Sequence, residues 1–99
     1  MDIVKDQIQQ VKDLCRKHRV ESLYLFGSAV SGDLMADSDI DFLVKFQSFD
    51  LKLYFKNYMS LKKQLDNLFK RDIDLLEEQT LKNPCLIRSI DQSKQLIYG

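Results

Sequence analysis

This 99-residue chain lacks the features of a disulfide-rich, membrane-bound or strongly basic protein. Its two cysteines, Cys15 and Cys85, stand far apart without a CxxC pair or a Cys/His cluster, so neither a disulfide nor a zinc site is expected. No apolar run reaches the roughly 20 residues that span a bilayer, and the N-terminus has no signal-peptide pattern. Fifteen basic and fifteen acidic residues cancel, which excludes a general attraction to nucleic acid or to a membrane. A reducing cytoplasm fits these absences best.

Repeats, linkers and low-complexity stretches are absent as well. Ninety-nine residues allow one hydrophobic core but not two, so we expect a single domain over residues 1–99. The one histidine, His18, comes at the end of the first predicted helix, where positive charge compensates the helix dipole. We therefore expect His18 to be a surface residue rather than a metal ligand or a catalytic base.

The charges that are present are distributed unevenly along the chain. Residues 21–44 hold five acids and no lysine or arginine, whereas residues 45–71 hold seven bases and two acids. An acidic site followed by a basic segment suits a metal ion and a polyphosphate. The solvated faces of ordinary helices are the simpler explanation for most of these lysines.

Hydrophobic periodicity predicts alternating helices and strands. The predicted helices cover residues 2–18, 28–34, 50–68 and 83–90, and the predicted strands cover 20–26, 40–46, 72–76 and 95–98. Asp2, Asp50 and Asn83 are the expected helix N-caps, and Pro84 suits the first helical position. Short connections between these elements favour an α+β fold, a mixed sheet with flanking helices.

The stretch from Leu23 to Phe46 organises the chain. Its second strand opens on Asp39-Ile40-Asp41, and side chains alternate along a strand, so both carboxylates fall on one face while the opposite face is apolar. Two like charges this close raise each other's pKa unless a cation lies between them. Oxygen ligands favour Mg²⁺ or Mn²⁺.

A third carboxylate is available from the next strand, which begins Asp72-Ile73-Asp74. We favour Asp74 over Asp72, because Lys70-Arg71-Asp72 is typical of an exposed approach to a strand. Three carboxylates at one sheet edge are what a two-metal phosphoryl-transfer site needs.

Gly27-Ser28 ends the first strand and begins the predicted short helix. Glycine allows a ligand to approach the backbone closely, and a helix start offers free N–H groups to an anion. The Ser28 hydroxyl serves either a phosphate or its own helix as an N-cap. Taken alone, a Gly-Ser pair is more often an ordinary turn.

The run FGSAVSGDLMADSDIDFLV places ten residues between Gly27-Ser28 and Asp39-x-Asp41. This pattern resembles the signature of the nucleotidyltransferase superfamily with the DNA polymerase β-like fold. RDIDLL and the tail LKNPCLIRSIDQSKQLIYG resemble its small stand-alone branch, the minimal nucleotidyltransferase (MNT) domains. The resemblance implies that Asp39, Asp41 and Asp74 are catalytic and bind two Mg²⁺ ions, with Asp74 also activating the acceptor hydroxyl. It implies that Gly27 and Ser28 bind the triphosphate of the substrate, ATP.

The resemblance also implies a partner. Family members of this size are commonly MntA-type antitoxins paired with a helical HEPN toxin, a ribonuclease, and several are thought to silence it by transferring AMP to a toxin tyrosine. This implies an adenylyltransferase that forms a complex with its partner and contacts neither membrane nor nucleic acid directly. Two alternatives stay open: a non-catalytic antitoxin or binding module that inhibits by occlusion, and the catalytic half of a two-chain antibiotic nucleotidyltransferase.

The chain departs from the family pattern at one place. Many relatives carry arginine soon after Gly-Ser, whereas this chain continues Ala29-Val30-Ser31-Gly32. The positive charge that faces the phosphates is then expected from Mg²⁺, the helix N-terminus, and Lys52, Lys56 or the partner protein.

Overall fold

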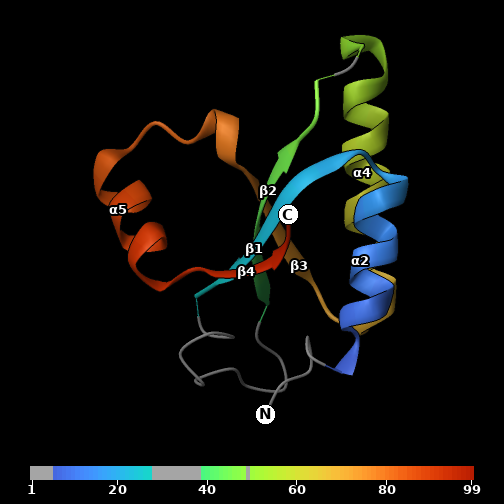
Figure 1. Cartoon of the computed structure of the whole chain (residues 1–99), viewed down its shortest axis with the longest axis horizontal. Helices are drawn as coiled ribbons and strands as arrows, with labels where there is room; N and C mark the ends of the chain where they lie inside the picture. Colours follow the sequence, from blue (N-terminus) through green and yellow to red (C-terminus); the bar gives the residue numbers. More distant parts are fainter. Residues whose placement is uncertain (1–5, 28–38, 49) are drawn as a thin grey trace.

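The computed structural model describes residues 6–27, 39–48 and 50–99 (Figure 1). The elements within them are α2 (Ile8–Lys17), β1 (Val20–Phe26), β2 (Ile40–Phe46), α4 (Leu51–Phe69), β3 (Ile73–Glu77), the 3₁₀ turn η1 (Glu78–Thr80), α5 (Pro84–Ser93) and β4 (Gln95–Tyr98). The strands predicted at 20–26, 40–46 and 95–98 are confirmed, and the one predicted at 72–76 is shifted by one residue. The Asp2 cap and the helix predicted at 28–34 lie outside the described residues.

The four strands form one mixed sheet in the order β3-β2-β1-β4. Strand β1 is antiparallel to β2 and to β4, whereas β2 and β3 are parallel. Parallel neighbours need a crossover connection, and α4 supplies it. Helices α2 and α4 lie side by side over one face of the sheet, and α5 lies on the other side (Figure 1). The predicted α+β fold is confirmed.

The main core lies between the sheet and the helices α2 and α4. Strand β2 contributes Ile40, Phe42 and Val44, all fully buried. Leu61 and Leu65 of α4 are buried in the same cluster. Each such side chain contributes about 1.5–3 kcal/mol of favourable burial, so the helix-facing side of β2 is fixed by this layer.

Side-chain caps start two of the helices as the sequence indicates. The Asp50 carboxylate accepts a hydrogen bond of 3.0 Å from the Lys52 N–H at the start of α4. The Asn83 side-chain oxygen accepts from the N–H groups of Cys85 and Leu86 at the start of α5. Both predicted N-caps are therefore confirmed. None of the helices in the described ranges has the length and hydropathy of a membrane-spanning segment.

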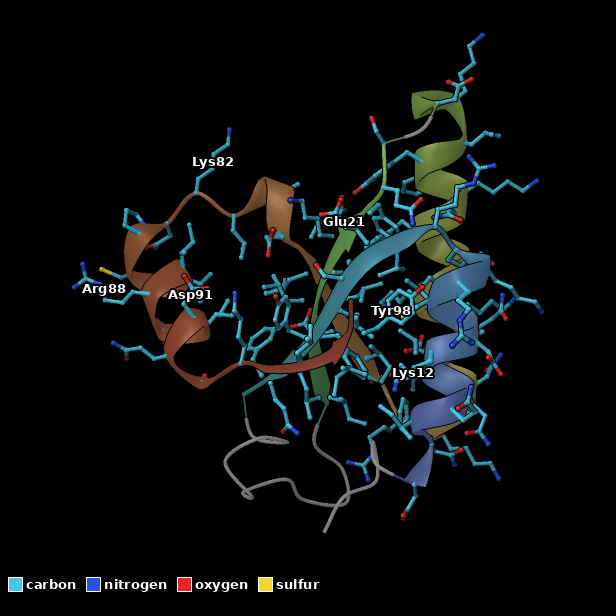
Figure 2. The ribbon with its side chains drawn as sticks, viewed as in Figure 1. Lys12, Glu21, Lys82, Arg88, Asp91 and Tyr98 are labelled. Carbon is cyan, nitrogen blue, oxygen red and sulfur yellow. The ribbon has the colours of Figure 1, made fainter. Side chains whose placement is uncertain are left out.

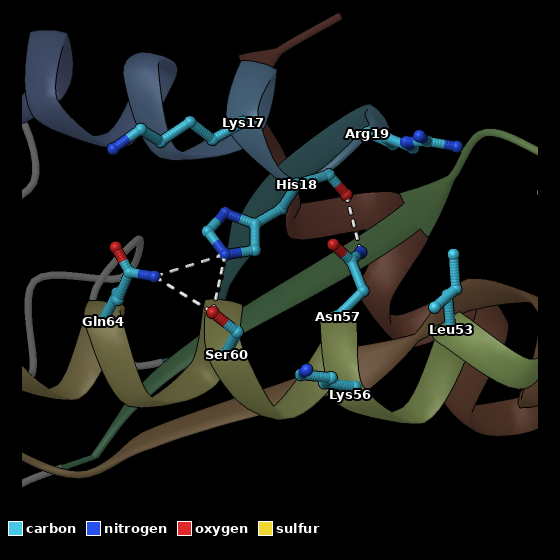
Figure 3. A pocket seen from close by; sticks show the side chains of 8 residues that line it. All are labelled: Lys17, His18, Arg19, Leu53, Lys56, Asn57, Ser60 and Gln64. Atoms are coloured by element: carbon cyan, nitrogen blue, oxygen red, sulfur yellow. Dashed lines mark hydrogen bonds between the residues drawn. The ribbon is translucent and has the colours of Figure 1, made fainter.

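The prediction that His18 is a surface residue is wrong, since its exposed fraction is only 5%. Its ring Nδ1 donates to the Leu14 carbonyl at 2.8 Å, and the Ser60 hydroxyl of α4 lies 3.0 Å from Nε2 (Figure 3). The Asn57 amide donates to the His18 carbonyl at 2.7 Å. Because α4 covers the turn after α2, this histidine joins two helices instead of facing water.

Candidate active site

Two of the predicted acids are neighbours across the pair β2–β3. Asp41 and Asp74 are partners in the parallel register, so their side chains project from the same face of the sheet. This face is opposite to the one that packs on α2 and α4, because Phe42 and Ile73 alternate with them and are buried there. Asp39 is exposed and directly precedes β2. Asp41 is half-buried, and Asp74 is exposed.

Strand β3 is an edge strand, so half of its backbone groups have no strand to pair with. The Asp72 carbonyl accepts from the Ile40 N–H of β2 at 3.2 Å. Because backbone groups alternate along a strand, those of Ile73 and Leu75 point away from β2. These outward groups need other partners to be satisfied.

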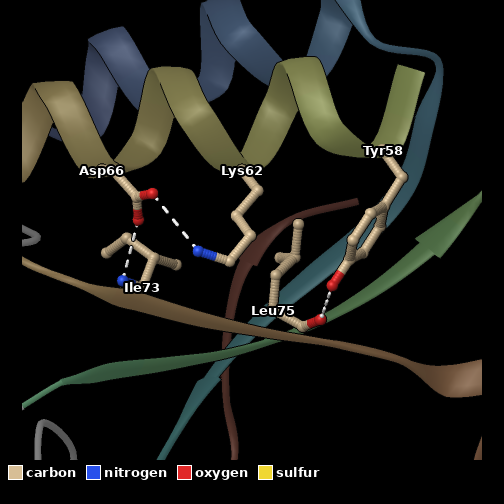
Figure 4. A network of polar contacts seen from close by, with 5 residues as sticks. All are labelled: Tyr58, Lys62, Asp66, Ile73 and Leu75. Carbon is tan, nitrogen blue, oxygen red and sulfur yellow. Dashed lines mark hydrogen bonds and ion pairs between the residues drawn. The ribbon is translucent and has the colours of Figure 1, made fainter. Parts of the chain in front are cut away.

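Helix α4 supplies those partners on both sides of Asp74 (Figure 4). The Asp66 carboxylate accepts from the Ile73 N–H at 2.9 Å, and the Tyr58 hydroxyl donates to the Leu75 carbonyl at 2.5 Å. The residue before Asp74 and the residue after it are thus held by side chains of one helix. Asp66 and Tyr58 are the positioning residues that the sequence analysis did not identify.

The electrostatics of the acid group centre on Asp41. Burial raises the pKa of the Asp41 carboxyl, and the nearby charges of Asp74 and then Asp39 raise that pKa further. All three effects oppose the ionised form. A cation beside Asp41 would relieve the repulsion among these carboxylates.

Gly27, which follows β1, is required by its contact with Asp41. Its φ angle of +76° lies in the left-handed region, a backbone conformation that residues other than glycine rarely adopt. A Cβ atom on residue 27 would also collide with Asp41 Oδ2 and lie 3.3 Å from its Cγ. The glycine therefore makes room for the acid at the end of β1.

The donor chemistry of this group suits a hard divalent cation, since all its candidate ligands are carboxylate oxygens. Within residues 6–27, 39–48 and 50–99, however, no three His, Cys, Asp or Glu side chains are arranged as a metal site. The described carboxylates thus supply oxygen donors that repel one another. They do not by themselves form a complete set of ligands around one metal ion. Ser28, the predicted phosphate ligand, lies outside the described residues.

Lys56 of α4 does not lie on the face that carries Asp41 and Asp74. Lys56 lines a groove of about 400 Å³ between α2 and α4, with Lys17 and Arg19 (Figure 3). Lys52 belongs to the same helix, which covers the opposite face of the sheet. Lys56 therefore does not face the acids, while the expectation for Lys52 stays a prediction.

A second cavity, of about 270 Å³, lies between α5 and the sheet on the face that carries Asp41. Its apolar walls are formed by Leu43, Leu81, Ile87 and Ile90. Its charged lining consists of Glu78, Asp91 and Lys94. Figure 2 places Asp91 on the side of α5 that faces the sheet and Arg88 on the far side.

Lys94 brings positive charge to this face of the sheet. Its ammonium lies 2.8 Å from Asp91 Oδ1 and 4.4 Å from the centroid of the Tyr24 ring. Tyr24 pairs with Leu43 in the antiparallel register, two residues along from the pair of Phe26 with Asp41. Sequence reasoning missed Lys94 because nothing in the pattern predicts that the end of α5 returns to β1.

Comparison with known proteins identifies a matching family model and several similar proteins. The family model described as "Polymerase beta, Nucleotidyltransferase" matches residues 9–99. A candidate protein adenylyltransferase of Methanocaldococcus jannaschii is 30% identical over 99 residues, covering 92% of this chain and 96% of the relative. The protein adenylyltransferase MntA of Thermococcus cleftensis is 33% identical over 72 residues, covering 73% of this chain and 70% of the relative.

Solved structures agree with the fold. A candidate minimal nucleotidyltransferase superposes with a TM-score of 0.79 at 28% identity, covering 96% of this chain and 95% of the other. The MNT antitoxin in complex with the tri-AMPylated HEPN toxin of Shewanella oneidensis gives a TM-score of 0.67 at 19% identity. That match covers 96% of this chain and 71% of the other. At this lower identity the second likeness establishes a shared fold.

Proposed function

The chain belongs to the polymerase beta nucleotidyltransferase family, and we propose that it is a Mg²⁺-dependent adenylyltransferase that transfers AMP from ATP to a partner protein. The observation that supports this most directly is the pairing of Asp41 with Asp74 on adjacent strands, next to the glycine that makes room for Asp41. The names of the relatives as protein adenylyltransferases support the choice of AMP and of a protein acceptor.

Each residue of the site has a proposed role. Asp39, Asp41 and Asp74 hold Mg²⁺, which neutralises phosphate charge when bound. Gly27 and Ser28 bind the triphosphate. The acceptor oxygen forms a bond to the α-phosphorus of ATP as the bond to the β-phosphate oxygen breaks. Pyrophosphate leaves, and the proton of the acceptor hydroxyl passes to the Asp74 carboxylate as the general base.

The proposed acceptor is a tyrosine hydroxyl of a helical HEPN toxin, and the transfer makes this chain the antitoxin of the pair. A protein with the same fold has been solved with a tri-AMPylated HEPN toxin, which supports a partner of this kind. Asp74 is exposed, so a hydroxyl on another protein is able to reach its carboxylate.

A non-catalytic binding module is the second candidate function. It is favoured by exposed apolar side chains on α4, where Phe55 is 72% and Met59 is 44% exposed. A surface of this kind suits a protein partner. In that case the chain inhibits its partner by covering it, and the three acids are relics of the family.

Ligand-dependent stability tests the enzymatic proposal. Mg²⁺ with ATP at about 100 times the dissociation constant should stabilise the wild-type fold by roughly 2.7 kcal/mol, because the ligands bind only the folded state. The double variant Asp39→Asn/Asp41→Asn should lose this shift in a thermal melt. The control variant Asp6→Asn/Asp13→Asn changes two exposed acids of the α2 region and should keep it. Equal shifts in all three proteins would contradict the assigned metal ligands.

A further inference from the structure

We propose that the groove between α2 and α4 is a second binding site of this protein, for a small ligand that carries two or more phosphate groups. The groove lies on the face of the sheet opposite to the one that carries Asp41 and Asp74. It is therefore separate from the proposed ATP site, and the proposal does not depend on the proposed function.

The charge of the groove is the first argument. Lys17, Arg19 and Lys56 line it, and none of the described side chains in its lining is acidic. Lys17 and Arg19 come from the end of α2 and the turn after it, and Lys56 comes from α4 on the facing wall (Figure 3). Like charges on the two walls of one groove repel one another, and the protein around them focuses their field. An anion between the walls would offset this repulsion.

Stabilisation of the helices explains only part of this charge. Cations near the last turn of a helix interact favourably with its dipole, which accounts for Lys17 and Arg19 at the end of α2. Lys56 is in the second turn of α4, where the dipole does not favour a cation. None of the residues three or four positions away from it along the helix is acidic. Within residues 6–27, 39–48 and 50–99, Lys17 and Lys56 form no ion pair.

Buried contacts hold the two walls of the groove together. His18 is only 5% exposed, and its Nε2 lies 3.0 Å from the Ser60 hydroxyl and 3.3 Å from the Gln64 side-chain nitrogen. The Asn57 amide donates to the His18 carbonyl at 2.7 Å. These contacts join the turn after α2 to α4 at three points. A ligand therefore meets a preformed site and does not have to order its walls, which lowers the cost of binding.

The size and shape of the groove indicate the class of ligand. Its volume of about 400 Å³ lies within the roughly 300–1,000 Å³ of small-molecule sites. Figure 3 shows Lys17 and Arg19 pointing in opposite directions along the groove, so phosphate groups at more than one point match the cations better than one orthophosphate does. Guanidinium and ammonium groups are strong partners of phosphate oxygens. An acidic peptide or an RNA backbone is a long chain that would extend beyond a cavity of this size.

Calorimetric titration with pyrophosphate in EDTA tests the proposal. Without a divalent cation the carboxylates of the acid face repel pyrophosphate, so binding under these conditions reports on the groove. Wild-type protein should bind pyrophosphate more tightly than orthophosphate, and the affinity should fall as NaCl is raised. Lys17→Gln/Lys56→Gln should weaken pyrophosphate binding by about tenfold or more, because each change removes a charged hydrogen-bond donor.

Lys12→Gln/Lys63→Gln is the matched control. It removes the same charge from the same two helices at positions outside the groove, so it should leave the pyrophosphate affinity unchanged. The side chains of these four lysines make no hydrogen bond or ion pair with the described residues, so thermal melts without phosphate should match the wild type for both double variants. An equal loss of affinity in both would show a general charge effect and overturn the site.

ADP distinguishes inorganic from organic sources of the phosphate groups. ADP that binds no more tightly than pyrophosphate in EDTA would support an inorganic ligand. Tighter binding of ADP would support an organic ligand that also contacts Leu53, which is 51% exposed at the groove. An oligoribonucleotide that binds through Lys17 and Lys56, in a protein that does not bind pyrophosphate, would overturn the assignment to a small ligand.

Chemical-shift mapping of the wild-type protein with pyrophosphate gives a second readout that needs no variant. The amide signals of residues 17–19 and 53–60 should move. Signals that move only at residues 39–41 and 72–75, or an affinity that falls in Asp39→Asn/Asp41→Asn, would place pyrophosphate at the acids and overturn the proposal. Stabilisation by Mg²⁺ with ATP is measured separately, so the proposed function would stand in either case.

Discussion

At the scale of single residues, the acid site depends on the contact between Gly27 and Asp41. The glycine has a positive φ angle, and the Asp41 carboxylate occupies the space that a side chain on residue 27 would need. Two separate physical reasons thus require glycine here, and only the second involves Asp41. A mutant cycle separates them.

Gly27→Ala should lower the free energy of unfolding by more than the roughly 1–2 kcal/mol expected for a left-handed alanine, because the new Cβ also displaces Asp41. In an Asp41→Ala background the same change should cost only the backbone contribution. Urea denaturation of the four proteins measures the difference. An equal loss in both backgrounds would show that the close approach of Asp41 is not what excludes a side chain.

Asp41→Asn should raise stability at neutral pH in the absence of metal. The pKa of Asp41 is raised in the folded protein, so between the ordinary Asp pKa and the raised value the folded state binds more protons than the unfolded state. Ionisation of Asp41 therefore lowers the free energy of unfolding of the wild-type protein as pH rises. The extra stability of Asp41→Asn over wild type should shrink as pH falls towards about 3.9, the ordinary pKa of Asp. Thermal melts from pH 7 to pH 4 measure the difference in stability between the variant and wild type, with Asp13→Asn, a change at an exposed acid, as the control. A variant that is less stable than wild type at pH 7 would contradict the raised pKa.

At the scale of elements, α4 both completes the core and fixes the edge strand that carries Asp74. Its buried side chains follow the helical period, but the contacts of Asp66 and Tyr58 with the β3 backbone do not follow from any pattern. These contacts give hydrogen-bond partners to backbone groups of the edge strand β3 that would otherwise be open to pairing with another chain. The helix therefore links fold stability to the position of an acid on the other face of the sheet.

Asp66→Ala should cost about 1–3 kcal/mol of stability, because it leaves the Ile73 N–H without its partner. It should also reduce nucleotide transfer more than nucleotide binding, since β3 carries Asp74. Lys62→Ala removes only the ion pair of 3.2 Å with Asp66 and should cost less than about 1 kcal/mol. Chemical denaturation and a transfer assay on both variants check this. An Asp66→Ala protein no less stable than Lys62→Ala would contradict the anchoring role.

Sequence patterns predicted most elements because their signals are local. Alternation of apolar residues located β1 and β2, and the caps Asp50 and Asn83 located the starts of α4 and α5. The same patterns failed for His18, because its burial depends on a helix about 40 residues further along the chain. Two similar strand starts predict that Asp41 and Asp74 converge at one sheet edge, yet only the fold shows that their strands are parallel neighbours with the two residues in register.

At the scale of the whole molecule, the sheet separates two chemically different surfaces. The face towards α5 carries the acids and the cavity with Lys94, whereas the groove on the helical side carries Lys17, Arg19 and Lys56. Charge summed over the sequence hides this division, because the total is zero. Because of this division, Lys56, one of the residues expected to face the phosphates, lies on the side away from the acids.

The central claim is that the acid face transfers AMP to a partner protein, and intact-mass analysis of the partner after incubation with MgATP tests it most directly. Wild-type protein should add the mass of AMP to the co-expressed HEPN partner. Asp74→Asn should retain much of the nucleotide binding but abolish the transfer, because the carboxylate is needed mainly in the transition state. Asp13→Asn, which changes an exposed acid of α2 away from the acid face, should still transfer AMP. A wild-type chain that neutralises its partner without adding any mass, and an Asp74→Asn variant that neutralises it equally well, would contradict the account.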